Sequence, residues 1–230
     1  MPMALFSLPA IPDVPVKGEN DGYAVARIFC VGRNYAAHAA EMGNEVPEAP
    51  FYFTKSPAHL HLSGATLPYP PGTEDCHHEV ELVVALGAPL FRATPEEAAA
   101  AIYAYGCGLD MTRRDLQISE RKKQRPWDLG KDFDGGAIIA RLTKASEFTP
   151  ATQTITLDLD GTRRQGSTLD LMLNDVVQVL CHLSGFYRLA PGDLIYTGTP
   201  EGVGPVVPGN HLSGQIEGLD PVELTITDPE

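Results

Sequence analysis

Two carboxylates separated by one residue, Glu79 and Glu81, are the first side chains in this sequence that could hold a cation together. In an extended strand, residues i and i+2 point to the same face and lie roughly 6.6 Å apart along the backbone. Val83 and Ala85 continue that face with apolar side chains, which indicates that the pair ends an otherwise buried strand. Such carboxylates repel each other unless a cation lies between them, whereas a solvated strand edge needs none. The spacing alone favours a solvated edge, and the apolar continuation makes a metal site and a solvated edge equally favoured.

A third carboxylate, Asp110, ends a short run of small and apolar residues. If a helix begins near Asp110, then Asp110, Arg114 and Gln117 share one helical face. Taken alone, this pattern is typical of a capping aspartate followed by an ion pair with Arg114. Together with Glu79 and Glu81, Asp110 would supply a third oxygen ligand. An all-oxygen set suits Mg²⁺, Mn²⁺ or Ca²⁺ rather than zinc.

His38 and Glu41 lie three residues apart in the Ala-rich segment 34–42, which predicts a short helix that ends at Gly43. On a helix the two side chains can meet on one face. A histidine oriented by a carboxylate can act as the general base for a water molecule. A surface ion pair would show the same spacing. Lys131 could be a substrate-binding cation or a surface lysine, and its spacing does not decide between the two.

The elements that must position these residues are mainly strands. Alternating or continuous apolar runs predict strands over 27–31, 51–55, 77–86, 105–109, 154–159, 194–197 and 222–226. Asp160-Gly161 predicts a hairpin, and Thr94, Pro95 and Glu97 predict a capped helix from Thr94 to about Tyr103. Further helices are expected over 112–123 and 169–183. Because strands and helices do not alternate regularly, the prediction is an α+β, mainly β architecture.

Composition narrows the class of partner. The chain of 230 residues has 30 acidic and 17 basic side chains and a net charge of −13, which argues against nucleic acid and favours a small-molecule partner. No run reaches membrane-spanning length, and four widely spaced cysteines form no C-x-x-C pair. The predicted protein is therefore cytoplasmic, with no membrane contact. The Pro-rich residues 1–26 are expected to be an N-terminal arm, and 27–230 a single catalytic domain.

Six motifs, which follow one another along the sequence, extend this interpretation over most of the chain. They are CVGRNYAAH (30–38), PFYFTK (50–55), HHEVE (77–81), GLDMTRRDLQ (108–117), RPWDLGK (125–131) and TGTPEGVG (197–204). Together they resemble the fumarylacetoacetate hydrolase family, in particular its small bacterial branch of acylpyruvate and fumarylpyruvate hydrolases. The resemblance implies a mixed β-sandwich roll with a few peripheral helices, usually a homodimer.

The resemblance also implies roles for individual residues. Glu79, Glu81 and Asp110 become Mg²⁺ ligands, with Mn²⁺ or Ca²⁺ as alternatives, and His38 with Glu41 activates water. Lys131 would stabilise negative charge, and substrate contacts are implied for Arg114, Gln117 and Thr199. One departure is that Asp128 and Asp132, which flank Lys131, stand where relatives often carry uncharged residues. Their charge would weaken the hold on an anionic substrate.

The implied reaction is metal-dependent cleavage of a carbon–carbon bond in a small anionic keto acid, an acylpyruvate. Fumarylpyruvate is the favoured substrate, giving fumarate and pyruvate at the end of gentisate breakdown. An alternative on the same metal site is oxaloacetate decarboxylation or keto–enol tautomerisation, which needs no attacking water. A further alternative is a non-catalytic module in which the three carboxylates bind a structural cation.

Overall fold

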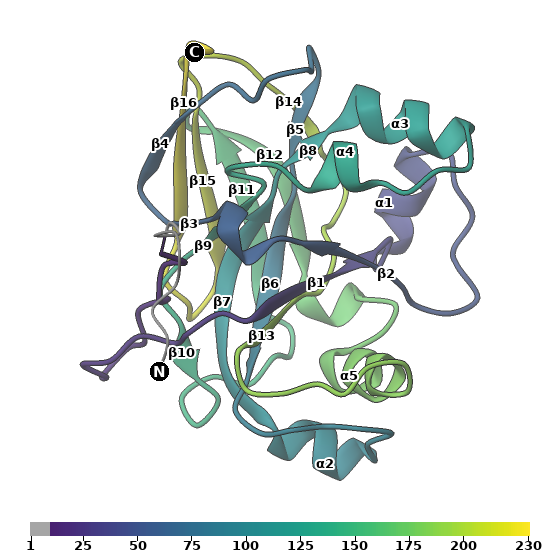
Figure 1. Cartoon of the computed structure of the whole chain (residues 1–230), viewed down its shortest axis with the longest axis vertical. Helices are drawn as coiled ribbons and strands as arrows, with labels where there is room; N and C mark the ends of the chain where they lie inside the picture. The colour runs from purple at the N-terminus through teal and green to yellow at the C-terminus, as the bar shows by residue number, and fades with distance from the viewer. Residues whose placement is uncertain (1–9) are drawn as a thin grey trace, which may run out of the picture.

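Strands dominate the structure, a computed structural model that describes residues 10–230 (Figure 1). The largest sheet has eight strands, seven of which form one path while the eighth pairs with a strand of that path. Its order is β2 (Phe51–Lys55), β1 (Arg27–Gly32), β13 (Asp193–Tyr196), β6 (Val80–Leu86), β7 (Ile102–Asp110), β9 (Ala137–Ile139) and β3 (Leu60–Leu62), with β10 (Thr143–Lys144) paired to β7. The prediction of a mainly β fold with few helices is confirmed.

Two smaller sheets complete the roll. A five-stranded sheet has the order β12 (Thr162–Thr168), β11 (Thr154–Leu159), β15 (His211–Ile216), β16 (Val222–Thr227) and β4 (Ala65–Pro68). A three-stranded sheet has the order β14 (Gly204–Val206), β5 (Cys76–His78) and β8 (Thr112–Arg113). The predicted hairpin joins β11 to β12, and both Asp160 and Gly161 have the positive φ that its tight turn requires.

The helices are short and peripheral. In Figure 1, α1 and α3 with α4 lie near one end of the large sheet, and α2 and α5 lie at the other end. Their bounds are α1 (Ala36–Glu41), α2 (Pro95–Ala100), α3 (Arg114–Lys122), α4 (Asp128–Lys131) and α5 (Val176–Ser184), with 3₁₀ turns at Pro57–His59 and Leu169–Leu171. The first group contributes His38, Arg114 and Lys131 to the region described below.

Three helix predictions had the right element and wrong limits. The capping box of Thr94 and Glu97 is present, but α2 ends at Ala100 because the chain then enters β7. The segment 112–123 begins as strand β8 and becomes helical only at Arg114. The segment 169–183 is a 3₁₀ turn followed by α5, whose start is fixed by a second capping box between Asp175 and Gln178. Helix α4 was not predicted.

Strand β6 is buried on both faces and separates two hydrophobic clusters. Val80, Leu82 and Val84 belong to the cluster shared with the five-stranded sheet and α5. Val83 and Ala85 belong to the second cluster, which also contains residues of the N-terminal segment. The predicted strand 77–86 is therefore interrupted at Glu79 into β5 and β6, and its apolar face continues as expected.

The N-terminal segment packs on the body where the structure describes it. Val14 and Val16 are buried, Val14 pairs with Tyr23, and Val16 pairs with Leu142. Residues 1–9 of the predicted arm lie outside the described residues, so the division at residue 26 stays a prediction. Across residues 10–230, no helix is long and apolar enough to span a membrane.

Candidate active site and metal centre

Three buried carboxylates converge where β5, β6 and β7 meet. Glu79 lies in the break between β5 and β6, Glu81 in β6, and Asp110 is the last residue of β7. The Asp110 N–H donates to the Glu79 carbonyl at 2.9 Å, which fixes the end of β7 beside the break. Each carboxylate offers one oxygen atom, and these three oxygen atoms lie within 4.8 Å of one another. The solvated-edge alternative is therefore wrong.

Asp110 lies at the end of a strand, as its run of small and apolar residues indicates. The alternative of a helix that begins near Asp110 is wrong, because Asp110 ends β7 and α3 begins only at Arg114. Residue 111 leaves β7, and β8 then pairs with β5 before the helix begins, so helical spacing does not apply to Asp110. The residue nevertheless reaches the carboxylate cluster, because β7 pairs with β6 along its whole length.

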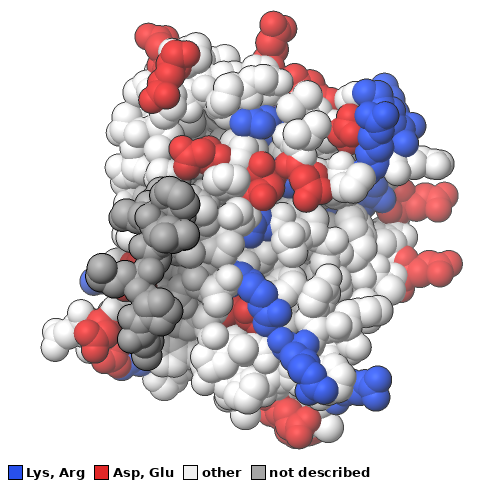
Figure 2. Space-filling model, viewed as in Figure 1, with Lys and Arg blue, Asp and Glu red and all other residues white. Residues whose placement is uncertain are grey.

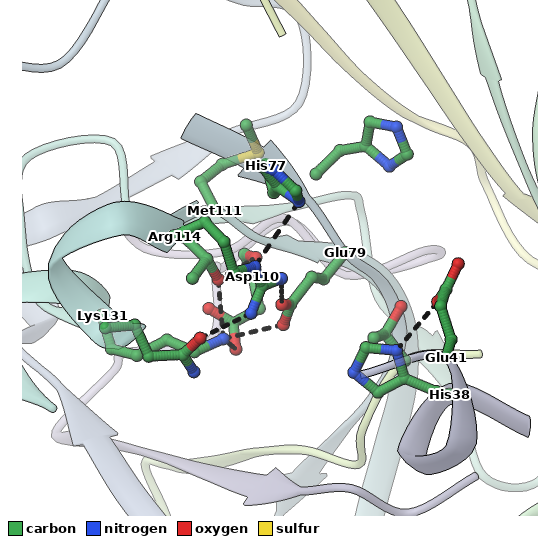
Figure 3. Close-up of polar contacts among 12 residues, drawn as sticks. His38, Glu41, His77, Glu79, Asp110, Met111, Arg114 and Lys131 are labelled. Atoms are coloured by element: carbon green, nitrogen blue, oxygen red, sulfur yellow. Dashed lines mark hydrogen bonds and ion pairs between the residues drawn. The ribbon is translucent and has the colours of Figure 1, made fainter. Parts of the chain in front are cut away.

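Two buried lysines neutralise part of the cluster. The Lys131 Nζ donates to Glu79 Oε2 at 2.7 Å, Asp110 Oδ2 at 2.8 Å and Thr112 Oγ1 at 2.7 Å (Figure 3). Lys55, on β2, places its Nζ 2.8 Å from Asp110 Oδ1 and donates to the Met111 carbonyl at 3.0 Å. Burial alone would lower the pKa of Lys131, but Asp110 and Glu79 outweigh it and raise that pKa. Lys131 is thus held as a cation.

Lys131 reaches the cluster because α4 lies unusually close to α3. A side-chain carbon at Gly130 would approach the Gln117 backbone nitrogen to 2.8 Å, so the preceding residue must be glycine for this approach. Asp132 points elsewhere, since its Oδ1 accepts from the Ser56 N–H at 2.8 Å and lies 2.7 Å from His59 Nδ1. These local partners reduce the weakening of substrate binding that was expected from the charge of Asp132.

Arg114 supplies a third cationic group from the inner face of α3. Its Nη2 donates to Glu79 Oε1, and its Nη1 donates to Gln117 Oε1 at 2.6 Å. Its Nε donates to His77 Nδ1 at 3.5 Å, and the other ring nitrogen of His77 lies 2.9 Å from Asp75. Burial would raise the pKa of Glu79, but Lys131 and Arg114 outweigh it, and the result is a pKa far below the ordinary range.

Glu81 differs from its neighbours because it has no ion-pair partner among residues 10–230. Its Oε2 accepts from the Gly198 N–H at 2.7 Å. Burial, followed by the charges of Asp110 and Glu79, raises its pKa well above the ordinary value. No cationic side chain among the described residues balances the negative charge of Glu81, and a divalent cation among the three carboxylates would balance it. The all-oxygen donor set therefore fits a hard cation.

His38 and Glu41 lie on α1, apart from the carboxylate cluster in Figure 3. The His38 Nδ1 lies 3.4 Å from Glu41 Oε2, and both Glu41 oxygens accept from the Gly202 N–H at 3.1 Å. Because a carboxylate only accepts, Nδ1 carries the proton and Nε2 keeps its lone pair. Burial lowers the pKa of His38, although Glu79 and Glu41 act in the opposite direction. A neutral imidazole can accept a proton.

Eight of the nine predicted site residues line one cleft, and Glu41 stands behind His38. The eight are His38, Glu79, Glu81, Asp110, Arg114, Gln117, Lys131 and Thr199. The Thr199 hydroxyl is committed within the protein, since it donates to the Val80 carbonyl at 2.8 Å. Lys55 was missed as a site residue: it lies in the PFYFTK motif, but nothing in the local pattern shows that the end of β2 faces Asp110.

Gln165, also missed, ties the metal-ligand strand to the 197–204 loop. Its Oε1 accepts from the Val80 N–H at 3.1 Å, between the two glutamates, and lies 3.1 Å from His78 Nδ1. Its Nε2 donates to Thr199 Oγ1 at 2.8 Å and to the Pro200 carbonyl at 2.9 Å. Gln165 is fully buried on β12, a strand whose local sequence shows no signal for this role.

We expect Gln165→Leu to weaken cation binding and stability together. The change removes the side-chain partner of the Val80 N–H and of the Pro200 carbonyl, and each buried group left unpaired costs about 1–3 kcal/mol. Loss of a residue that orients metal ligands lowers metal affinity by about 10–100-fold. Mn²⁺ titration and urea unfolding measure the two effects, with Gln215→Leu on the exposed side of β15 as the matched control. Unchanged Mn²⁺ affinity would show that Gln165 does not position the ligands.

Comparisons with known proteins agree with this geometry. Residues 27–227 match the model of the fumarylacetoacetate (FAA) hydrolase C-terminal domain. The chain belongs to this family. It is 47% identical over 179 residues to a fumarylpyruvate hydrolase of a Ralstonia species, covering 78% of this chain and 93% of that protein. It is also 40% identical over 198 residues to an oxaloacetate tautomerase of Escherichia coli K12, covering 85% and 90% of the two chains.

A solved family member shares the fold almost completely. The crystal structure of fumarylpyruvate hydrolase from Pseudomonas aeruginosa, in complex with Mn²⁺ and pyruvate, superposes with a TM-score of 0.94 at 40% identity. The match covers 98% of this chain and 100% of that one. The resemblance inferred from the six motifs, the family fold and the expectation of an enzyme are thereby confirmed. The carboxylate trio and the relative's Mn²⁺ together support a divalent metal in this family member.

Proposed function

We propose that this chain is a metal-dependent hydrolase that cleaves a carbon–carbon bond in acylpyruvates, with fumarylpyruvate as its preferred substrate. One observation carries the proposal: the buried trio Glu79, Glu81 and Asp110 shares a cleft with His38, whose orientation suits a general base. Relatives named as fumarylpyruvate hydrolases support the choice of substrate, and one of them binds Mn²⁺ and pyruvate.

The charges of the site suit a dianionic substrate. Three carboxylates face three cationic side chains, Lys55, Lys131 and Arg114, so their formal charges cancel. A bound divalent cation leaves the site with a surplus of two positive charges. Fumarylpyruvate is itself a dianion, so this surplus favours its binding. A local positive field can thus exist inside a protein of net charge −13.

The chain's own residues account for the proton and charge movements. When bound, the cation supplies a Lewis acid for the carboxylate and 2-oxo oxygens of the substrate. His38 Nε2 accepts a proton from water, and the hydroxide adds to the C4 carbonyl carbon. The C3–C4 bond then breaks, and its electron pair moves to the pyruvate fragment, which leaves as the enolate. The proton that His38 took from water is returned to C3 of that enolate. We assign to Lys131, whose ammonium lines the same cleft, the stabilisation of the enolate's negative charge.

The remaining parts of the proposal concern the setting of the reaction. We propose Mg²⁺ as the physiological metal, with Mn²⁺ or Ca²⁺ as alternatives, since all three accept oxygen ligands. All four cysteines are free thiols, which supports a reducing compartment such as the cytoplasm. Fumarate and pyruvate as products would place the step in aromatic (gentisate) catabolism. The homodimer also stays a prediction, which light scattering tests.

A substrate panel tests the proposed function directly. Loss of the enol absorbance would be followed for fumarylpyruvate, acetylpyruvate and fumarylacetoacetate, and oxaloacetate would be assayed beside them, each with and without EDTA. We expect Mg²⁺- or Mn²⁺-dependent hydrolysis, fastest with fumarylpyruvate and abolished by EDTA, because the carboxylate trio needs its cation to bind the 2-oxo acid. Activity on none of these compounds, with either metal present, would overturn the proposal.

Oxaloacetate tautomerisation or decarboxylation is the second candidate, favoured by the E. coli relative that carries the tautomerase name. Both reactions pass through an enolate, which Lys131 and the metal could stabilise. Neither reaction needs the water that we assign to His38. The two candidates therefore differ in how strongly they depend on His38.

A further inference from the structure

We propose that Arg33 and Arg121 form a subsite for a second carboxylate, so that the cleft selects acylpyruvates whose acyl group ends in a carboxylate. This inference rests on the proposed function and names its substrate class. Both arginines line the same cleft as the carboxylate trio and His38. Neither has an ion-pair partner among residues 10–230, although the chain carries an excess of acidic side chains.

Arg33 is held at the cleft by its backbone and by an aromatic ring. It follows β1 and has a φ of 55°, in the left-handed region that non-glycine residues seldom adopt. Its guanidinium lies over the Phe51 ring, 5.5 Å from the ring centre. Burial, and then the nearby charge of Arg121, lowers the pKa of Arg33. An anion that contacts both guanidinium groups would offset the repulsion between them.

Arg121 lies in the last turn of α3 and lines the cleft together with Arg33. Its Nη1 donates to Asn44 Oδ1 at 2.9 Å, and Asn44 in turn donates to the Met42 carbonyl at 2.9 Å just after α1. Figure 2 shows Lys and Arg side chains gathered over α3. One donor of Arg121 is thus used to hold it in place, and four N–H groups remain available.

The spacing along α3 sets the length of the ligand. Arg114, Ile118 and Arg121 are at i, i+4 and i+7, so they share one face of the helix. Arg114 contacts the metal-ligand cluster at one end, and Arg121 lies about 10.5 Å further along the helix axis. Ile118 and Trp127 give the cleft between them an apolar lining. A seven-carbon chain with a carboxylate at each end matches this order of polar, apolar and polar surfaces.

Two unreactive ligands test the subsite. 2-Oxoheptanedioate and 2-oxoheptanoate have the same seven carbons and the same 2-oxo acid end, and only the first has a second carboxylate. Calorimetry on the Mn²⁺-loaded protein would compare their dissociation constants. Since a hydrogen-bonded carboxylate at a cationic site is worth about 1.5–3 kcal/mol, we expect the dicarboxylate to bind about 10- to 100-fold more tightly.

Variants identify the arginines responsible. Arg33→Met and Arg121→Met are each expected to lower dicarboxylate affinity about tenfold and to leave 2-oxoheptanoate affinity within about twofold. Lys122→Met is the matched control, because Lys122 is an exposed cation beside Arg121 on α3 that does not line the cleft. Arg121 is exposed, so its replacement keeps the test valid even if the Arg33 variant folds poorly.

The outcomes separate this inference from the proposed function. Equal affinity for the two ligands in the wild-type protein, no measurable binding of the dicarboxylate, or an equal loss in Lys122→Met would overturn the subsite. Neither ligand has a 4-oxo group, so their binding does not depend on hydrolysis. A protein that prefers the dicarboxylate yet leaves fumarylpyruvate and acetylpyruvate intact would contradict the proposed hydrolase and keep the subsite.

Discussion

Replacement of His38 by alanine is expected to lower kcat/KM for fumarylpyruvate hydrolysis by about 10²- to 10⁴-fold, the usual contribution of a positioned general base. The structure gives the reason. His38 Nδ1 is occupied by Glu41, burial lowers the pKa of the imidazole, and the ring lines the cleft that holds the carboxylate trio. Without this base, the attacking water keeps both protons. Steady-state rates with saturating Mn²⁺ measure the effect.

The same variant separates hydrolysis from enolate chemistry. Decarboxylation of oxaloacetate needs no attacking water, so we expect the His38→Ala variant to retain it along with Mn²⁺ binding. His211→Ala is the matched control, because His211 lies on β15 with an exposed side chain and hydrogen-bonds Thr225. Equal loss of hydrolysis and decarboxylation in His38→Ala would show that His38 has a role common to both reactions and does not activate water.

Local sequence patterns predicted elements well where a single signal determines them. The capping box at Thr94 and Glu97 gave the start of α2, and Asp160-Gly161 gave the hairpin between β11 and β12. The predicted limits of helices were wrong where strand pairing in the tertiary structure outweighed the local helix propensity. Residues 112–113 belong to β8 because β5 offers them hydrogen bonds, although their sequence continues smoothly into α3. Short strands such as β9 and β14 carry too few residues for a period to be recognised.

The site residues divide in the same way, into those that local sequence patterns reveal and those that depend on tertiary contacts. Glu79 and Glu81 could be found because a single residue separates them, and helical spacing paired His38 with Glu41. The six motifs contain the other predicted site residues. Lys55 and Gln165 escaped because their roles depend on contacts across more than 50 residues of chain: Lys55 reaches Asp110, and Gln165 reaches Val80. Asp110 reaches the cluster through the pairing of β6 with β7 and not through a helical face shared with Arg114.

Lys131 links the stability of the protein to the occupancy of the metal site. Its ammonium bridges Glu79 and Asp110 in a fully buried setting. Lys131→Met removes one charge of a buried network, for which the usual cost is about 3–5 kcal/mol. Arg114 still pairs with Glu79, and Lys55 still pairs with Asp110, so we expect a loss near 3 kcal/mol in protein without added metal. Urea unfolding in the presence of EDTA measures it.

Divalent metal should reverse most of that loss without restoring catalysis. A cation bound by Glu79, Glu81 and Asp110 replaces the missing positive charge. Binding to the folded state alone raises the unfolding free energy with the logarithm of the free cation concentration. Mn²⁺ should therefore raise the unfolding free energy of Lys131→Met more than that of the wild type, while hydrolysis stays low because no ammonium faces the enolate.

Lys123→Met is the matched control. It removes only an exposed ion pair with Glu120 and should change the unfolding free energy by about 1 kcal/mol or less. An equal gain from Mn²⁺ in wild type and Lys131→Met would mean that the lysine and the metal do not compensate the same carboxylates.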